Sequence, residues 1–108
     1  MSNIPIRPLG NTAENVSILC LGGGHIGNQH LTSKEAVRIM HHAIDSGVTF
    51  FDNAWEYHEG RSESFMGQAI CDRRERVFLM TKVCAAMAGT SYSRPRNIST
   101  AIFTETSI

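Results

Sequence analysis

The chain has 108 residues, which is enough for one domain of ordinary size and too few for two. Apolar residues make up 42% of it and charged residues 19%, as in folded globular proteins, so the composition argues against disorder. Ten lysine and arginine residues balance ten acidic residues. This neutral balance offers no basic field for nucleic acid or an anionic membrane surface, so we expect a small-molecule or protein partner.

The sequence predicts neither a targeting segment nor a membrane span. No apolar run in the sequence is longer than six residues, whereas a membrane span needs ~20. The first eight residues do not resemble a signal peptide, so the expected location is the cytoplasm. The three cysteines form no Cys-x-x-Cys pair, as expected of reduced thiols.

The first predicted elements are extended. Residues 4–9 contain two prolines and are predicted to form a short edge segment, which ends in a turn at residues 10–12. Residues 16–21 are almost all apolar and are stopped by three glycines. This run predicts one strand that is buried on both faces, as in a parallel sheet.

A helix and a second strand follow. Thr32 and Glu35 have the spacing of a capping box. After them, apolar residues recur at steps of three and four up to Gly47, which is suited to the left-handed position after a helix. Residues 48–51 then predict a second buried strand, which ends at Asp52.

The last predicted elements complete an alternating pattern. A polar loop at residues 53–61 leads to residues 62–64, which are predicted to cap a second helix. A third buried strand is predicted at residues 77–81 and runs into Lys82. The order βαβαβ predicts parallel strands joined by helices, and such folds place functional residues beyond the carboxyl ends of the strands.

Chemically useful side chains stand at those strand ends. Asp52 and Lys82 follow the second and third strands and can form an ion pair, and Tyr57 lies in the loop after Asp52. A cation beside a phenol favours the phenolate and lowers a pKa that starts at ~10, so the tyrosine could serve as a general acid in carbonyl reduction. The alternative from spacing alone is a surface ion pair beside a half-buried aromatic ring.

A longer motif surrounds these residues. Residues 50–63 are Phe-Phe-Asp-Asn-Ala-Trp-Glu-Tyr-His-Glu-Gly-Arg-Ser-Glu, and Met-Gly-Gln-Ala and Met-Thr-Lys-Val-Cys follow at 66–69 and 80–84. Over residues 4–84 the chain resembles the aldo-keto reductase family. The resemblance implies a (β/α)₈ TIM barrel, of which this α/β chain would supply about three βα units preceded by a short N-terminal hairpin. It also implies NADPH-dependent reduction of aldehydes or ketones.

The resemblance further assigns residue roles. It implies that Tyr57 is the proton donor, that Lys82 lowers its pKa, and that Asp52 holds Lys82 and lies beside the nicotinamide ribose. It also implies that three glycines line the nicotinamide end of the cofactor: Gly22, Gly23 and Gly24.

Two other side chains of the tyrosine-bearing loop are candidates for substrate contact. Trp55 is expected to line a substrate pocket, with cover of the barrel rim as the alternative. His58 adjoins Tyr57 and is expected to approach the substrate, with a solvated loop position as the alternative. None of the five histidines is joined by cysteine or carboxylate ligands at a zinc-like spacing, so no metal site is expected.

The chain also departs from the family pattern. The family's fourth catalytic residue is a histidine that ends the fourth strand, and no histidine follows His58. Residues 85–108 are rich in serine, threonine and alanine, and we expect a divergent, poorly structured tail after a barrel segment at residues 1–84. When residues 86–90 are translated back to codons and read in a shifted frame, the result is compatible with the family's His-Gly-Arg-Asp. We therefore infer truncation or a frameshift near Cys84.

A second motif gives a competing interpretation. Residues 22–27 match the pattern Gly-x-Gly-x-x-Gly of dinucleotide-binding Rossmann folds. That fold needs a helix that opens at the third glycine and an acid near the end of the second strand. Here the helix cap is Thr32 and Asp45 falls within the helix, so we interpret the match as fortuitous.

Two functions of different classes therefore remain open. The first is aldo-keto reductase chemistry on a small carbonyl compound. The second is a non-catalytic remnant or interaction fragment, because three strands of a barrel have exposed edges at which we expect self-association.

Overall fold

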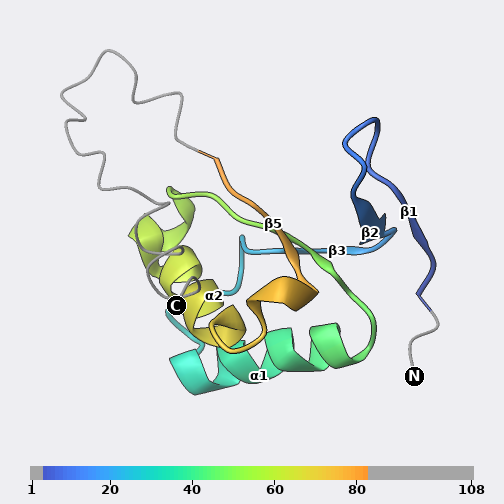
Figure 1. The fold of residues 1–108 in the computed structure, drawn as a ribbon. Coiled ribbons are helices and arrows are strands. Elements are labelled where there is room, and N and C mark those ends of the chain that lie inside the picture. Colours follow the sequence, from blue (N-terminus) through green and yellow to red (C-terminus); the bar gives the residue numbers. More distant parts are fainter. Residues whose placement is uncertain (1–3, 83–108) are drawn as a thin grey trace, which may run out of the picture.

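The computed structural model describes residues 4–82, which form a hairpin, a parallel sheet and two α-helices (Figure 1). The strands are β1 (Ile6–Pro8), β2 (Asn15–Ser17), β3 (Cys20–Gly22), β4 (Phe50–Asp52) and β5 (Phe78–Met80). The helices are α1 (Ser33–Asp45) and α2 (Arg61–Ile70), with 3₁₀ turns at Tyr57–Gly60 and Arg74–Arg76. The tail expected at residues 85–108 lies outside the described residues.

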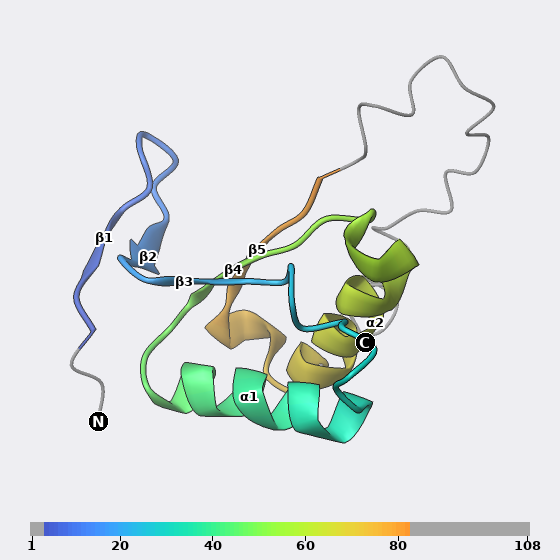
Figure 2. The same cartoon turned by 180° about the vertical axis from the view of Figure 1, so that it is seen from behind.

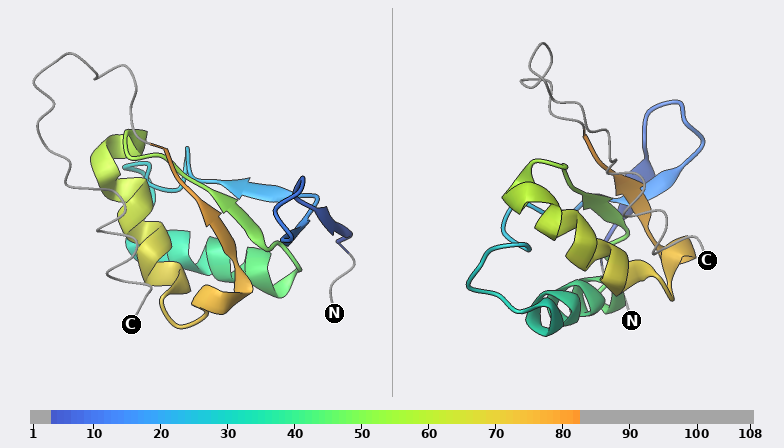
Figure 3. Two further views of the ribbon diagram at one scale, coloured as in Figure 1. Left: turned by 45° about the horizontal axis from the view of Figure 1, so that its top comes forward. Right: turned by 90° about the vertical axis from the view of Figure 1, so that its left-hand side faces the viewer.

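The predicted alternation of strands and helices is confirmed. Strands β3, β4 and β5 lie side by side in that order and are all parallel. Both helices cover the same face of this sheet, as Figures 2 and 3 show. The antiparallel pair β1 and β2 forms the predicted N-terminal hairpin and lies at one end of the sheet. The arrangement is a partial α/β barrel of the expected class.

The core lies between the sheet and the helices. Phe51 of β4 is fully buried there. Helix α1 contributes Met40 and α2 contributes Met66 and Ile70, and none of these three side chains has any exposed surface. They form one cluster, so burial of this single apolar layer fixes both helices on the sheet.

Helix α1 begins and ends as its sequence predicts. The Glu35 N–H donates to Thr32 Oγ1 at 3.1 Å, and the Thr32 N–H donates to Glu35 Oε1 at 2.9 Å, which completes the capping box. The Thr32 N–H and, at 3.2 Å, the Thr32 hydroxyl both donate to the Glu35 carboxylate, and these two bonds lower the pKa of Glu35 below its ordinary value. Beyond the helix, Gly47 has a φ of 107°, the left-handed conformation expected of it.

The strand predicted at residues 16–21 is wrong as one element. Its first part is β2, which pairs with β1 in the hairpin, and its last part is β3, which pairs with β4 in the parallel sheet. Ile18 and Leu19 between them are 57% and 56% exposed. Ser17 explains the change of partner. Its N–H donates to Thr49 Oγ1 and its Oγ accepts from the Thr49 N–H, both at 2.9 Å. At this point, hydrogen bonds to side chains take the place of backbone pairing between strands.

The cap predicted for the second helix is also wrong. Helix α2 begins at Arg61, and its N-cap is Gly60, with a φ of 92° and no side-chain cap. Ser62 instead lies inside the first turn and is fully buried. Its hydroxyl accepts a hydrogen bond from the Gly27 N–H at 3.0 Å, so it ties the loop before α1 to the first turn of α2.

Candidate active site

The predicted ion pair forms at the carboxyl ends of β4 and β5. Lys82 Nζ lies 2.7 Å from Asp52 Oδ1 and donates a second hydrogen bond to the Asn53 carbonyl, also at 2.7 Å. The side chains of Lys82 and Asp52 are 46% and 31% exposed. Two oxygens therefore fix the direction of an ammonium group that solvent can still reach.

Tyr57 joins this pair from the loop between β4 and α2. Its ring centroid lies 5.5 Å from Lys82 Nζ, within the range of a cation–π contact. Its N–H donates to the Ala54 carbonyl at 3.2 Å, which anchors the turn that carries the ring. The structure thus brings together the three candidate catalytic residues, although they lie on separate segments of the chain.

The three candidate glycines stand beside Asp52. Gly22 is the register partner of Asp52, and the Gly23 N–H donates to the Asp52 carbonyl at 2.7 Å. A Cβ added at Gly23 would lie only 2.5 Å from Asn53 Oδ1, whereas one added at Gly22 or Gly24 would meet nothing within 4 Å. Packing therefore explains only the middle glycine, and the two outer ones face open space.

The candidate substrate residues have different surroundings. Trp55 is half-buried, and its N–H donates to the Lys82 carbonyl at 3.1 Å, which places its backbone beside the ion pair. His58 is exposed, and its Nε2 lies 2.8 Å from the Gly24 carbonyl oxygen. The imidazole therefore reaches the three consecutive glycines Gly22–Gly24, which we call the glycine run. Its contact with substrate stays a prediction.

Asn53 is a buried polar residue at the site that the sequence pattern does not single out. It is fully buried, and its Nδ2 donates to the Ser62 carbonyl at 3.1 Å and lies 3.2 Å from the Met66 sulfur. Its Oδ1 accepts from the Ala54 N–H at 2.9 Å. The satisfied side chain holds in place the carbonyl that binds Lys82. The only signal in the sequence was its place inside the motif.

Glu63 is a second such residue. Its side chain is 1% exposed and accepts a hydrogen bond from Thr81 Oγ1 at 2.5 Å. Burial raises the pKa of Glu63 above its ordinary value, and the bond from Thr81 opposes this. Because Thr81 directly precedes Lys82, the contact ties the end of β5 to α2.

Two loops at this end of the sheet are tied together. We call residues 23–31 the glycine loop and residues 53–60 the tyrosine loop. Beside the contact between His58 and Gly24, the Gly27 N–H binds Ser62 Oγ in the interior, and Arg61 Nη2 donates to the Leu31 carbonyl at 3.0 Å. The glycine loop is thus bound at three points to the tyrosine loop and the start of α2.

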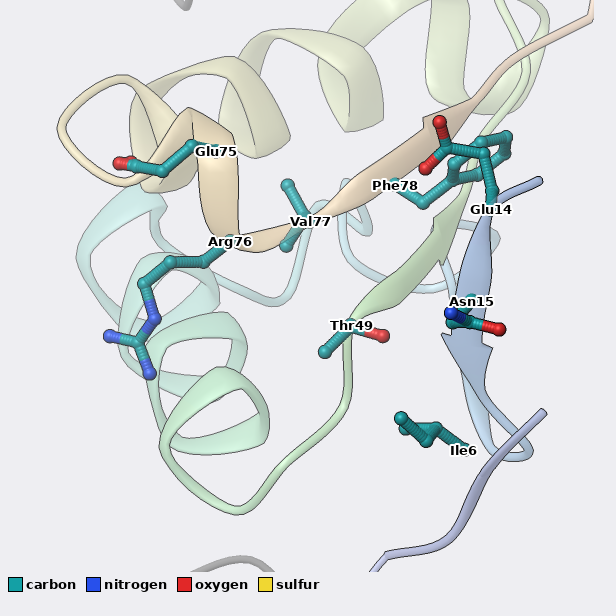
Figure 4. A pocket seen from close by; sticks show the side chains of 8 residues that line it. All are labelled: Ile6, Glu14, Asn15, Thr49, Glu75, Arg76, Val77 and Phe78. Carbon is teal, nitrogen blue, oxygen red and sulfur yellow. The ribbon is translucent and has the colours of Figure 1, made fainter. Parts of the chain in front are cut away.

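A hollow of about 280 Å³ lies elsewhere, beside the hairpin (Figure 4). Its walls include Ile6 and Asn15 of the hairpin, together with Thr49 and Val77. Thr49 and Val77 immediately precede β4 and β5. The hollow is therefore at the amino ends of the strands, opposite the ion pair, and is not part of the candidate site.

Within residues 4–82, no three histidine, cysteine or acidic side chains are grouped as a metal site would require. No helix in the same stretch has the length and apolar character needed to cross a membrane.

Parallel strands joined by helices, with polar residues at their carboxyl ends, define the class of protein as a (β/α)₈ barrel segment. A family model described as "Aldo/keto reductase family" matches residues 18–105. The chain belongs to the aldo/keto reductase family. The match continues past Cys84, where the motif resemblance ends.

Individual relatives agree with this assignment. The chain is 37% identical to "Aldo-keto reductase AFTS1" of Alternaria alternata, over 94% of this chain and 30% of that protein. The holo form of aldo-keto reductase AKR11C1 from Bacillus halodurans matches with a TM-score of 0.68 and 34% identity, over 74% of this chain and 26% of that one.

A further structure, an aldo-keto reductase from Klebsiella pneumoniae in complex with NADPH, matches with a TM-score of 0.69 and 28% identity, over 86% of this chain and 32% of that one. The chain thus spans less than a third of each of these relatives.

Proposed function

We propose that this chain carries the proton-donating part of an aldo-keto reductase site, which reduces an aldehyde or ketone to an alcohol with NADPH. The observation that carries the proposal is the position of the Lys82 ammonium, 2.7 Å from Asp52 and 5.5 Å from the centre of the Tyr57 ring. An acid, a cation and an anion in this order are suited to proton transfer at a carbonyl oxygen.

Each residue has a separate task in the proposed reaction. The Tyr57 hydroxyl donates its proton to the carbonyl oxygen, and the electron pair of the O–H bond stays on the phenolate. Lys82 stabilises that phenolate by its charge. Asp52 and the Asn53 carbonyl hold Lys82 so that its charge is already oriented before the proton moves.

The cofactor is proposed from this family's chemistry and from the glycine run. Reduced nicotinamide, when bound, supplies the hydride for the carbonyl carbon. Gly22 and Gly24 fit such a group, because their backbone borders open space next to Asp52 and a flat ring could approach it closely. The "NADPH" in the name of the Klebsiella structure supports the choice of cofactor.

The second candidate function is a non-catalytic fragment. It is favoured by the backbone edge of β5, which pairs with β4 on one side only among the described strands. Such an edge is a surface for pairing with another chain.

Turnover of the purified chain distinguishes the two functions. The sample is incubated with NADPH and a series of aldehydes, and NADPH absorbance is followed. Loss of turnover by about 10²- to 10⁴-fold in Tyr57→Phe is expected, whereas Tyr92→Phe makes the same chemical change at the other tyrosine and should retain it. No turnover in a folded sample would favour the non-catalytic function.

A further inference from the structure

The turn that carries Tyr57 has an unusual backbone. His58 and Glu59 have φ angles of 53° and 57°, and Gly60 follows with a φ of 92°. The left-handed region is unfavourable for residues with a Cβ, and two such residues in a row persist only when other contacts hold them. Some contact must therefore keep this turn in place.

The imidazole of His58 makes such a contact. Its Nε2 lies 2.8 Å from the Gly24 carbonyl oxygen, 34 positions away in the sequence. Because a carbonyl oxygen only accepts, the imidazole must carry its proton on Nε2 and donate it. The bond fastens the left-handed turn to the glycine loop.

Tyr57 is consequently held on both sides. On its N-terminal side, the backbone N–H of Tyr57 donates to the Ala54 carbonyl at 3.2 Å. On its C-terminal side, the next residue, His58, binds the Gly24 carbonyl. Without the second attachment, the turn is free to leave its strained conformation, and the ring is then no longer fixed beside Lys82.

We propose that His58 is a positioning residue, which holds the Tyr57 ring beside Lys82 by donating a hydrogen bond from Nε2 to the Gly24 carbonyl. The same bond joins Gly24 to the turn that carries the tyrosine. Its effect on turnover rests on the proposed reductase function, whereas its effect on the position of the ring does not.

Two substitutions separate the hydrogen bond from the bulk of the side chain. His58→Gln keeps an N–H donor at the end of a side chain of similar length, and His58→Leu has similar bulk but no donor. Both replacements carry a Cβ and are unbranched there, so both impose the same left-handed cost on the backbone. Any difference between them therefore reports on the donor.

The position of the ring is measured first, by NMR on the folded 108-residue chain. We expect the imidazole ¹⁵N shifts of His58 to show a protonated Nε2, and we expect nuclear Overhauser effects between the Tyr57 ring and the Lys82 side chain. His58→Leu should lose most of this ring signal and His58→Gln should keep it. Equal signals in both variants, or a neutral imidazole protonated on Nδ1, would overturn the proposal.

Turnover is measured second, with NADPH and an aldehyde. His58→Leu should lower kcat about tenfold and leave both KM values within about twofold, because ring misplacement affects the proton transfer rather than binding. His58→Gln should recover most of the loss. A Leu variant with full kcat would contradict the proposal. Absence of turnover in the unchanged chain would contradict only the reductase function, since the NMR result stands without it.

Discussion

The two faces of the parallel sheet differ in how they are covered. One face carries Leu21, Phe51 and Leu79 in register, and it packs against both helices, with Phe51 fully buried. The other face carries Cys20, Phe50 and Phe78. Cys20 is exposed and the two rings are half-buried. The helices therefore supply burial on one side only, and the difference separates the stabilising face from the open one.

The open face leads to the chemistry. Phe50 and Phe78 meet edge to face with centroids 5.7 Å apart, and Asp52 follows Phe50 on the same side of β4. Desolvation raises the pKa of the Cys20 thiol first, and the charge of Asp52 raises it further, against the opposing effect of Lys82. The Cys20 thiol is thus close enough to the ion pair for both of its charges to affect the pKa of the thiol.

The largest expected effect tests the difference between the faces directly. Phe51→Ala should lower the free energy of unfolding by about 3–5 kcal/mol, because it leaves a cavity beneath the helices. Phe50→Ala, one residue away on the open face, should cost only about 1 kcal/mol, since its ring is half-buried. Urea unfolding of both variants measures this, and equal losses would show that the open face is also packed.

A smaller effect is expected from two glycines near the site. A Cβ added at Gly27 would lie 2.6 Å from the backbone nitrogen of Ser62. Gly27→Ala should therefore destabilise the fold by about 1–3 kcal/mol through overpacking. Gly22→Ala, where a Cβ meets nothing within 4 Å, should change stability by less than about 0.5 kcal/mol. Thermal unfolding compares the two, and an unaffected Gly27→Ala would refute the tight contact between the loops.

Loss of the ion pair should matter still less for stability. Both partners are partly exposed, and such pairs contribute at most about 1 kcal/mol. Lys82→Met should accordingly unfold within about 1 kcal/mol of the unchanged chain, while any NADPH-dependent turnover disappears. Destabilisation as large as that of Phe51→Ala would mean that the site helps to hold the fold.

The smallest effect concerns the pH dependence of stability. Because the pKa of Glu63 is raised in the folded state, the folded chain binds a proton more readily than the unfolded one. Glu63 therefore makes the fold less stable as the pH rises above its ordinary pKa of 4.5 and through its raised pKa in the folded state. Glu63→Gln should remove this part of the slope, as urea midpoints at several pH values would show.

A companion variant gives the opposite sign. Thr81→Val removes the hydroxyl that lowers the pKa of Glu63, so it should steepen the loss of stability with rising pH. A shallower slope in this variant would contradict the assignment of Glu63 as its source.

Local signals in the sequence predicted much of the fold. The capping box of Thr32 and Glu35 and the turn at Gly47 depend on residues close together in the chain, and both are confirmed. The apolar run at residues 16–21 was misleading, because apolar character does not show which sheet a strand joins. There the exchange between Ser17 and Thr49, 32 positions apart, decides the outcome.

In the candidate site, too, some features follow from the sequence pattern and others depend on contacts between distant segments. Topology places Asp52 and Lys82 at the carboxyl ends of two neighbouring parallel strands, so their pairing was predictable from strand order. The contact of His58 with Gly24 and the burial of Asn53 depend on how two loops approach each other. No spacing within either loop encodes that approach.

The exchange between Ser17 and Thr49 has a consequence for how the molecule opens. Each residue's amide proton is bound to the other's side-chain oxygen, so neither can exchange with solvent until hairpin and sheet separate at this point. In hydrogen exchange, these two amides should be protected together and released together. The hairpin would then open with the sheet as one cooperative unit, although no backbone ladder joins it to β4.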